Sequence, residues 1–106
     1  MKAARLRPRA ERDLVDAARY YSKEGGMALG ARMFDAALAA LKPIQRMPGI
    51  GSLRLGELCD IPGLRSWGVP GFALRWFYFE MDRRLDVVRL LGERRDIASI
   101  LREEQS

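Results

Sequence analysis

The fold is decided by residues 73–91, which read ALRWFYFEMDRRLDVVRLL. The first part, Ala73–Met81, is almost continuously aromatic and apolar, which is typical of a central strand covered on both faces. Asp82-Arg83-Arg84 then interrupts the apolar run and predicts a turn. Leu85–Leu91 is again mostly apolar and rich in branched side chains, with Asp86 near its start and Arg89 within it as charged residues. This pattern predicts two neighbouring strands joined as a hairpin.

Two further strands are predicted earlier in the chain. Leu64–Val69 precedes the hairpin, and Lys2–Arg7 alternates apolar and basic residues. The first strand must pair with a later one, because a lone strand is not stable. Pro48–Gly63 is rich in turn residues and is predicted to be the longest loop. After the last strand, Asp96 is placed to cap a short final helix.

Two helices are predicted between the first strand and the loop. Pro8 suits a first helical turn, and apolar residues then recur every three or four positions until Gly25-Gly26, which favours a turn. A second helix is expected over Met27–Lys42, because Pro43 should kink or end it. The order strand, helix, helix, three strands, short helix predicts an α+β fold. We expect an antiparallel four-stranded sheet with the N-terminal helical hairpin packed on one face.

Composition limits the possible functions. The chain has 106 residues, a formal net charge of +5, no histidine and one cysteine. We therefore expect a single domain over residues 1–106, with no His-based catalytic group, no zinc site and no cofactor. No apolar run reaches the length of a transmembrane helix and no secretory signal is evident, so we expect a cytoplasmic location. The excess charge is almost wholly arginine, which binds carboxylates and phosphates.

Several motifs in the chain resemble, in the same order, those of one toxin superfamily. Leu6–Leu14 resembles the end of the first strand and the start of the first helix in ParE-type toxins of the RelE/ParE superfamily. Met47–Gly51 resembles the family's exit from the second helix, and Gly63–Trp67 resembles its Leu-Arg-Ser-aromatic strand. Leu85–Leu91 with Arg94–Asp96 is similar to its last strand. The resemblance covers nearly the whole chain and implies the same α+β fold.

The resemblance implies one of two functions. ParE-type members poison DNA gyrase, whereas RelE-type members are ribosome-dependent endoribonucleases that cut messenger RNA. RelE-type catalysis uses several Lys and Arg residues and a Tyr or His near the C-terminus. This chain has Gly92 and Ile100 near those places, Ala73 where a central-strand arginine is expected, and no lysine after Lys42. A ParE-like toxin without catalysis is therefore the first hypothesis, and mRNA cleavage is the alternative.

The resemblance also implies partners, and it directs attention to the arginines. We expect a cognate ParD-type antitoxin with an acidic amphipathic tail, and DNA gyrase as target. Direct nucleic-acid binding ranks last, because no helix carries a clean basic face. The candidates for target binding are Arg65, Trp67, Arg75, Arg89, Arg94 and Arg95. The candidates for antitoxin binding are Arg12, Arg19, Tyr20, Arg65, Arg75 and Arg89.

Three of these arginines also have a structural interpretation to consider. Arg65, Arg75 and Arg89 lie on three different predicted strands and could converge on the sheet face opposite the helical hairpin. An arginine within an apolar strand is costly to bury unless it is paired. For Arg89, the structural alternative is a pair with Glu80 across the strand hairpin, or a side chain that reaches the sheet edge.

Overall fold

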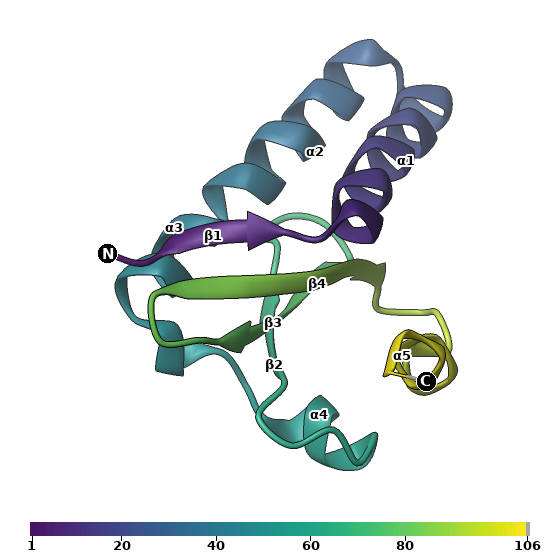
Figure 1. The fold of residues 1–106 in the computed structure, drawn as a ribbon. Helices are drawn as coiled ribbons and strands as arrows, with labels where there is room; N and C mark the ends of the chain where they lie inside the picture. Colours follow the sequence, from purple (N-terminus) through teal and green to yellow (C-terminus); the bar gives the residue numbers. More distant parts are fainter. Residues whose placement is uncertain (106) are drawn as a thin grey trace.

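In the computed structural model, which describes residues 1–105, a sheet lies between two layers of helices (Figure 1). The strands are β1 (Ala3–Leu6), β2 (Arg65–Gly68), β3 (Leu74–Glu80) and β4 (Arg84–Gly92), in the order β1-β4-β3-β2. The helices are α1 (Pro8–Gly25), α2 (Met27–Ala39), α3 (Leu41–Arg46), α4 (Arg54–Leu58) and α5 (Ile97–Gln105), with a 3-10 turn, η1, at Pro48–Ile50. Among residues 1–105, no helix is both long and apolar enough to cross a bilayer.

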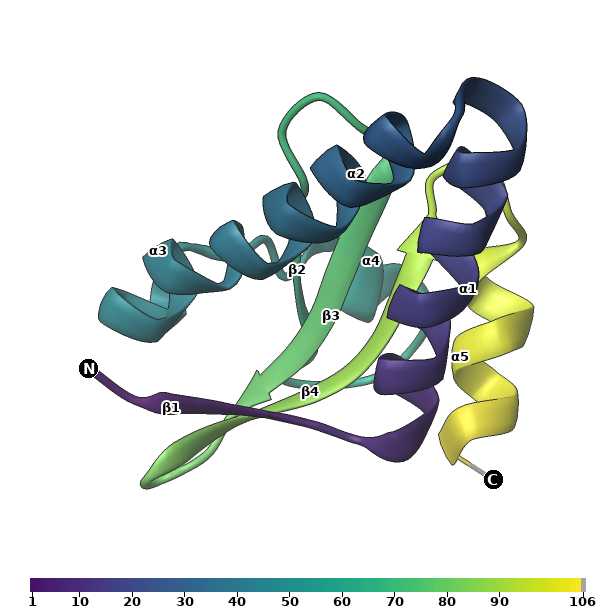
Figure 2. The same ribbon diagram turned by 90° about the horizontal axis from the view of Figure 1, so that it is seen from above.

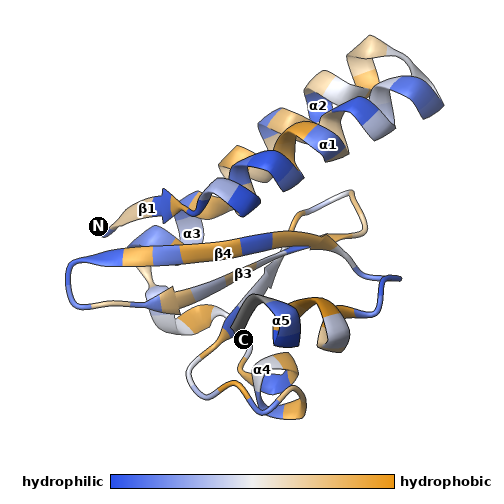
Figure 3. Cartoon of the chain, turned by 45° about the vertical axis from the view of Figure 1, so that its right-hand side comes forward, coloured by the Kyte–Doolittle hydropathy of each residue, from blue (hydrophilic) through white to orange (hydrophobic). Residues whose placement is uncertain are grey.

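The predicted hairpin of β3 and β4 is confirmed, and it forms the centre of the sheet. Trp76 and Tyr78 are fully buried on the face covered by α1 and α2, which we call the helical face. Phe77 is fully buried on the opposite face, among residues of α4, α5 and the loop between α4 and β2. We call this second face the far face. The alternation follows from the two-residue period of a strand. Figure 3 shows apolar colour along β4 and on parts of the helices on both sides of the sheet.

The expectation of a fully antiparallel sheet is wrong for β1. This strand runs parallel to β4, with Ala3 opposite Arg84 and Leu6 opposite Val87, so the sheet is mixed. Alternation of apolar and polar residues determines which side of a strand is buried, but it says nothing about the direction of the neighbour. A parallel neighbour requires a long crossover connection. Here the whole chain between the two strands, including both long helices, provides it (Figure 2).

The predicted helical hairpin is confirmed on one face of the sheet. Gly26, with φ of 93°, makes the turn between α1 and α2. On α2, Gly30 lies so close to Ala18 and Ser22 of α1 that a side chain there would collide with both. The second helix ends at Ala39 rather than at Lys42. Pro43 then lies in the first turn of α3, where its missing N–H is not needed.

The segment predicted as the longest loop contains regular structure. Residues 48–63 include η1 and α4, and Ser52 forms a bridge with Ser66 of β2. Gly56 of α4 packs so closely on the Leu64 carbonyl that no side chain would fit there. The final helix, α5, is confirmed, and the Asp96 carboxylate accepts hydrogen bonds from the Ser99 N–H at 3.2 Å and the Ser99 hydroxyl at 2.9 Å. Together α4 and α5 cover the far face.

Candidate functional site

The three strand arginines point to three different parts of the molecule, so the expected convergence on one face is wrong. Arg65 on β2 donates hydrogen bonds to the carbonyl oxygens of Gly49 and Gly51 at 3.1 and 2.8 Å. The β2–β3 register places Arg65 opposite Tyr78, whose ring lies on the helical face. Arg65 therefore holds the segment after α3 against the sheet through its Nη1 atom.

Arg89 is buried, and its partner is Asp13 of α1. The Nε and Nη2 atoms of Arg89 donate to the two carboxylate oxygens at 2.7 and 2.9 Å. The same carboxylate accepts the backbone N–H of Leu90 at 3.0 Å. Pairing between β1 and β4 ends at Val87, so Asp13 satisfies a backbone donor at the edge that β1 leaves open. Arg89 thus reaches the sheet edge, and it is not placed for direct contact with a partner.

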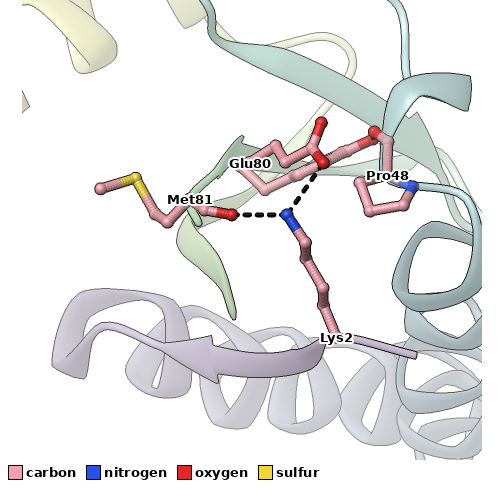
Figure 4. Close-up of polar contacts among 5 residues, drawn as sticks. Lys2, Pro48, Glu80 and Met81 are labelled. Atoms are coloured by element: carbon pink, nitrogen blue, oxygen red, sulfur yellow. Dashed lines mark hydrogen bonds and ion pairs between the residues drawn. The ribbon is translucent and has the colours of Figure 1, made fainter. Parts of the chain in front are cut away.

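Glu80 has a different partner from the one considered from the sequence. The Lys2 ammonium lies 3.0 Å from the Glu80 carboxylate and donates to the Met81 carbonyl at 2.6 Å (Figure 4). The proposed pair between Glu80 and Arg89 is therefore wrong. Lys2 instead ties the start of the chain to the end of β3.

Arg75 is the strand arginine that opens into a cavity, and it does so on the far face. Its Nε donates to the Ser66 hydroxyl oxygen at 3.2 Å, and its Nη1 lies 3.8 Å from the Glu93 carboxylate. The cavity has a volume of about 410 Å³ and is lined by residues of α4, β2, β3 and α5. Its walls also include Arg54, a basic residue that sequence reasoning did not select.

Arg94 and Arg95 are exposed in the turn after β4 and face α1 across a groove. This groove has a volume of about 600 Å³, and Tyr20 of α1 lines it together with the apolar side chains of Leu74 and Leu90. Tyr20 is 59% exposed, and its ring packs edge-on against the neighbouring tyrosine ring at 5.3 Å. The structure therefore brings two target candidates and one antitoxin candidate to the same groove.

The outer side of the helical hairpin carries a second groove, of about 490 Å³. Val15, Met27 and Phe34 line it, and Arg19 and Lys23 add positive charge. Val15 is 43% exposed and Met27 is 85% exposed. Sequence reasoning missed these two apolar residues. The sequence did contain a sign for Val15, because an apolar residue outside the buried stripe of α1 is expected to be exposed.

Arg12 and Trp67, the remaining candidates, lie apart from each other. Arg12 is exposed on α1. Trp67 is half-buried on the helical face, where it stands opposite Trp76 and packs against the core. Trp67 is therefore partly a core residue and offers only part of its ring to a partner.

The Tyr78 hydroxyl is used structurally and is not open to a substrate. It donates to the Pro48 carbonyl at 2.7 Å and accepts the Gly51 N–H at 3.1 Å. Burial raises the pKa of Tyr78 above its ordinary value, and the hydrogen bond from Gly51 and the nearby Arg65 partly offset this effect. Across residues 1–105, no three His, Cys, Asp or Glu side chains are placed to hold a metal ion.

Comparisons with known proteins agree with this arrangement. A solved structure described as "Chromosomal ParDE TA system from P. aeruginosa" has a similar fold, with a TM-score of 0.75 and 16% sequence identity, over 87% of this chain and 96% of that chain. No curated protein sequence matches the chain. A family model described as "ParE toxin of type II toxin-antitoxin system, parDE" matches residues 4–97. Because that match spans most of its length, the chain belongs to the ParE toxin family of type II toxin–antitoxin systems.

Proposed function

We propose that this chain is a cytoplasmic toxin that inhibits DNA gyrase by binding to it, and that a ParD-type antitoxin neutralises it. Membership of the ParE family carries the proposal. The distribution of polar groups supports binding over catalysis. Cleavage of RNA needs a group that can move a proton near neutral pH, yet the sequence has no histidine and the Tyr78 hydroxyl is engaged by Pro48 and Gly51.

We place the antitoxin on the outer groove of the helical hairpin. Its apolar floor includes Val15, Met27 and Phe34, while Arg19 and Lys23 supply positive charge. An acidic amphipathic helix is complementary to such a surface, because its apolar side packs on the floor and its carboxylates meet the cations. This arrangement uses Arg19 from the antitoxin candidates, and Arg12 and Tyr20 lie on the same helix.

The antitoxin site can be tested with a pair of exposed methionines. Met27 is 85% exposed and lines the groove, whereas Met47 is 62% exposed and lies at the end of α3. Met27→Ser should weaken binding of the antitoxin encoded next to this gene roughly tenfold, because an apolar contact is lost. Met47→Ser should leave it unchanged. Calorimetric titration measures both, and equal affinities would place the antitoxin elsewhere.

For the target, we propose the groove between α1 and the turn after β4. Arg94 and Arg95 are exposed there, next to Tyr20 and an apolar floor. In a supercoiling and cleavage assay with purified gyrase, the chain should reduce supercoiling and increase broken DNA. Arg94→Glu combined with Arg95→Glu should abolish the effect. Arg83→Glu combined with Arg84→Glu, the same change of charge at two exposed residues where β3 turns into β4, should not. No effect of the unmodified chain at any dose would reject gyrase as target and leave the family membership intact.

A further inference from the structure

The cavity on the far face of the sheet has more hydrogen-bond donors than the protein uses. It is lined by residues of α4, the strands β2 and β3 and the start of α5. Helices α4 and α5 lie on the side of the sheet away from α1 and α2 (Figure 3). Ser66 is only 1% exposed and lines this cavity. Its hydroxyl oxygen accepts the Arg75 Nε–H at 3.2 Å. The hydroxyl proton is therefore left for another acceptor, and none of the residues 1–105 provides one within hydrogen-bond distance.

The two arginines of the cavity also have guanidinium N–H groups that make no hydrogen bond within the described part of the chain. The Nη1 atom of Arg75 lies 3.8 Å from the Glu93 carboxylate, too far for a hydrogen bond. The Arg54 side chain makes no hydrogen bond or ion pair within the described part of the chain, although its backbone N–H donates to Ser52. Gly68, opposite Arg75 on β2, leaves room for the guanidinium, since a side chain there would come within 3.3 Å of Nη1. The Ser66 hydroxyl proton, the Arg54 guanidinium and the Nη groups of Arg75 thus meet in one cavity with no acceptor at hydrogen-bond distance among the described residues.

We propose that this cavity binds a carboxylate of a partner peptide, with an apolar side chain beside it. Leu55, Leu58 and Ile97 form the apolar part of the wall, and Leu58 is 65% exposed. A peptide can place an apolar side chain on this wall while its carboxylate meets Arg54 and Arg75. A nucleic acid fits the cavity less well, because its phosphate backbone would place charged groups against the apolar side chains of Leu55 and Leu58. The net charge of +5 also favours an acidic partner.

Glu93 acts as a weak internal competitor for this site. Its side chain is 47% exposed, and it stands at the rim of the cavity beside Arg75. A bound carboxylate would take over Arg75 and be repelled by Glu93. Removing the Glu93 charge should therefore strengthen binding, which is the opposite of what a contact residue would do. The site lies on the other face of the sheet from the proposed antitoxin groove, and its existence does not depend on gyrase as target.

The test is an NMR titration of the full chain with two tripeptides, N-acetyl-Leu-Glu-Leu-amide and the same peptide with Gln in place of Glu. The glutamate peptide should shift the Nε–Hε signals of Arg54 and Arg75, and the glutamine peptide should bind roughly tenfold more weakly. Equal binding of the two peptides would overturn the proposal. So would shifts of the same signals by a single-stranded oligonucleotide when the glutamate peptide causes none.

Three variants and a control refine the test. Arg54→Gln and Arg75→Gln should each weaken the glutamate peptide roughly tenfold, since each removes a charged donor. Arg54 is exposed, so its variant is expected to fold normally even if Arg75→Gln does not. Glu93→Gln should tighten binding several-fold. Arg83→Gln, with the same charge change at a distant exposed turn, should leave the affinity unchanged. If it weakens binding as much as Arg54→Gln does, the effect comes from net charge alone and the proposed site is rejected.

Discussion

Asp13 shows how much of this fold rests on one carboxylate. Its side chain is 12% exposed and that of Arg89 is 5% exposed, so the ion pair between α1 and β4 is shielded from water. Such a pair contributes little compared with well-packed apolar residues, but breaking it is costly because a charge stays buried with fewer partners. The same carboxylate also accepts the Leu90 N–H at the open part of the β4 edge.

Replacing Asp13 should therefore destabilise the protein strongly. Asp13→Ala is expected to lower the free energy of unfolding by about 3 kcal/mol. Asp16→Ala, at an exposed residue three positions further along α1, should change it by no more than about 0.5 kcal/mol. Urea unfolding of both variants measures the difference. Similar values for the two would mean that the buried pair is not important for stability.

Gly51 is a second residue with a specific steric role. A side chain there would collide with the Tyr78 ring, which its own N–H contacts. Gly51→Ala is expected to cost about 1 to 3 kcal/mol, because the loop must move away from the tyrosine. Gly49→Ala is the matched control, since a Cβ at that position meets no atom within 4 Å. Thermal unfolding should show a clearly lower Tm only for Gly51→Ala, and a loss of equal size in the control would contradict the explanation.

The sequence showed on which strands the arginines lie, but it did not show which residues their side chains contact. Asp13 and Arg89 are 76 residues apart, and nothing in either local pattern links them. A bulge in β4 shifts the register, so that Tyr78 faces Val87 while Phe77 faces Arg89. Strict alternation along the strand therefore misplaces the Arg89 side chain. The cavity around Arg75 was missed for a related reason, because its other donors come from segments that meet only in the folded protein.

At the scale of the elements, the strands, the two long helices and α5 were predicted, whereas α4 and the direction of β1 were not. The two long helices and the β3–β4 hairpin follow from apolar periodicity and turn residues. α4 is a single turn in a segment rich in glycine and proline, and its Gly56 packs closely on the Leu64 carbonyl, a contact that the local sequence does not reveal. The parallel direction of β1 depends on where β4 lies, so no local signal encodes it.

The helix α5 depends on its first residues for stability. Hydrogen bonds from Ser99, first from its backbone N–H and then from its hydroxyl, lower the pKa of Asp96. Because the pKa is lower in the folded state, this stabilisation is present above the ordinary pKa of an aspartate and is lost as the pH falls through the folded value. Asp96→Ala should make amide exchange in α5 several-fold faster at neutral pH, with little difference in acid. Asp82→Ala, in the exposed β3–β4 turn, should leave α5 exchange unchanged, and a pH-independent effect of Asp96→Ala would exclude the carboxylate as the cause.

At the scale of the whole molecule, the polar groups are distributed in a way that favours binding surfaces over an active centre. We expect the purified chain to leave messenger RNA intact on translating ribosomes, because it has no histidine and its buried tyrosine hydroxyl is already engaged. Primer extension on a defined message would detect cleavage at single-nucleotide resolution. Cleavage that disappears in Arg94→Ala would instead establish the ribonuclease alternative.

The parallel pairing of β1 with β4 has a consequence for the order in which parts of the protein fold during synthesis. Ala3 pairs with Arg84 and Leu6 pairs with Val87. The first strand therefore cannot join the sheet until the last strand has left the ribosome. The contacts between α1 and α2 are local in sequence, so the helical hairpin can begin to form much earlier during synthesis, before it packs on the sheet. An antitoxin that recognises the hairpin groove would therefore meet its binding surface on a nascent chain. Neutralisation would then begin before the toxin has finished folding.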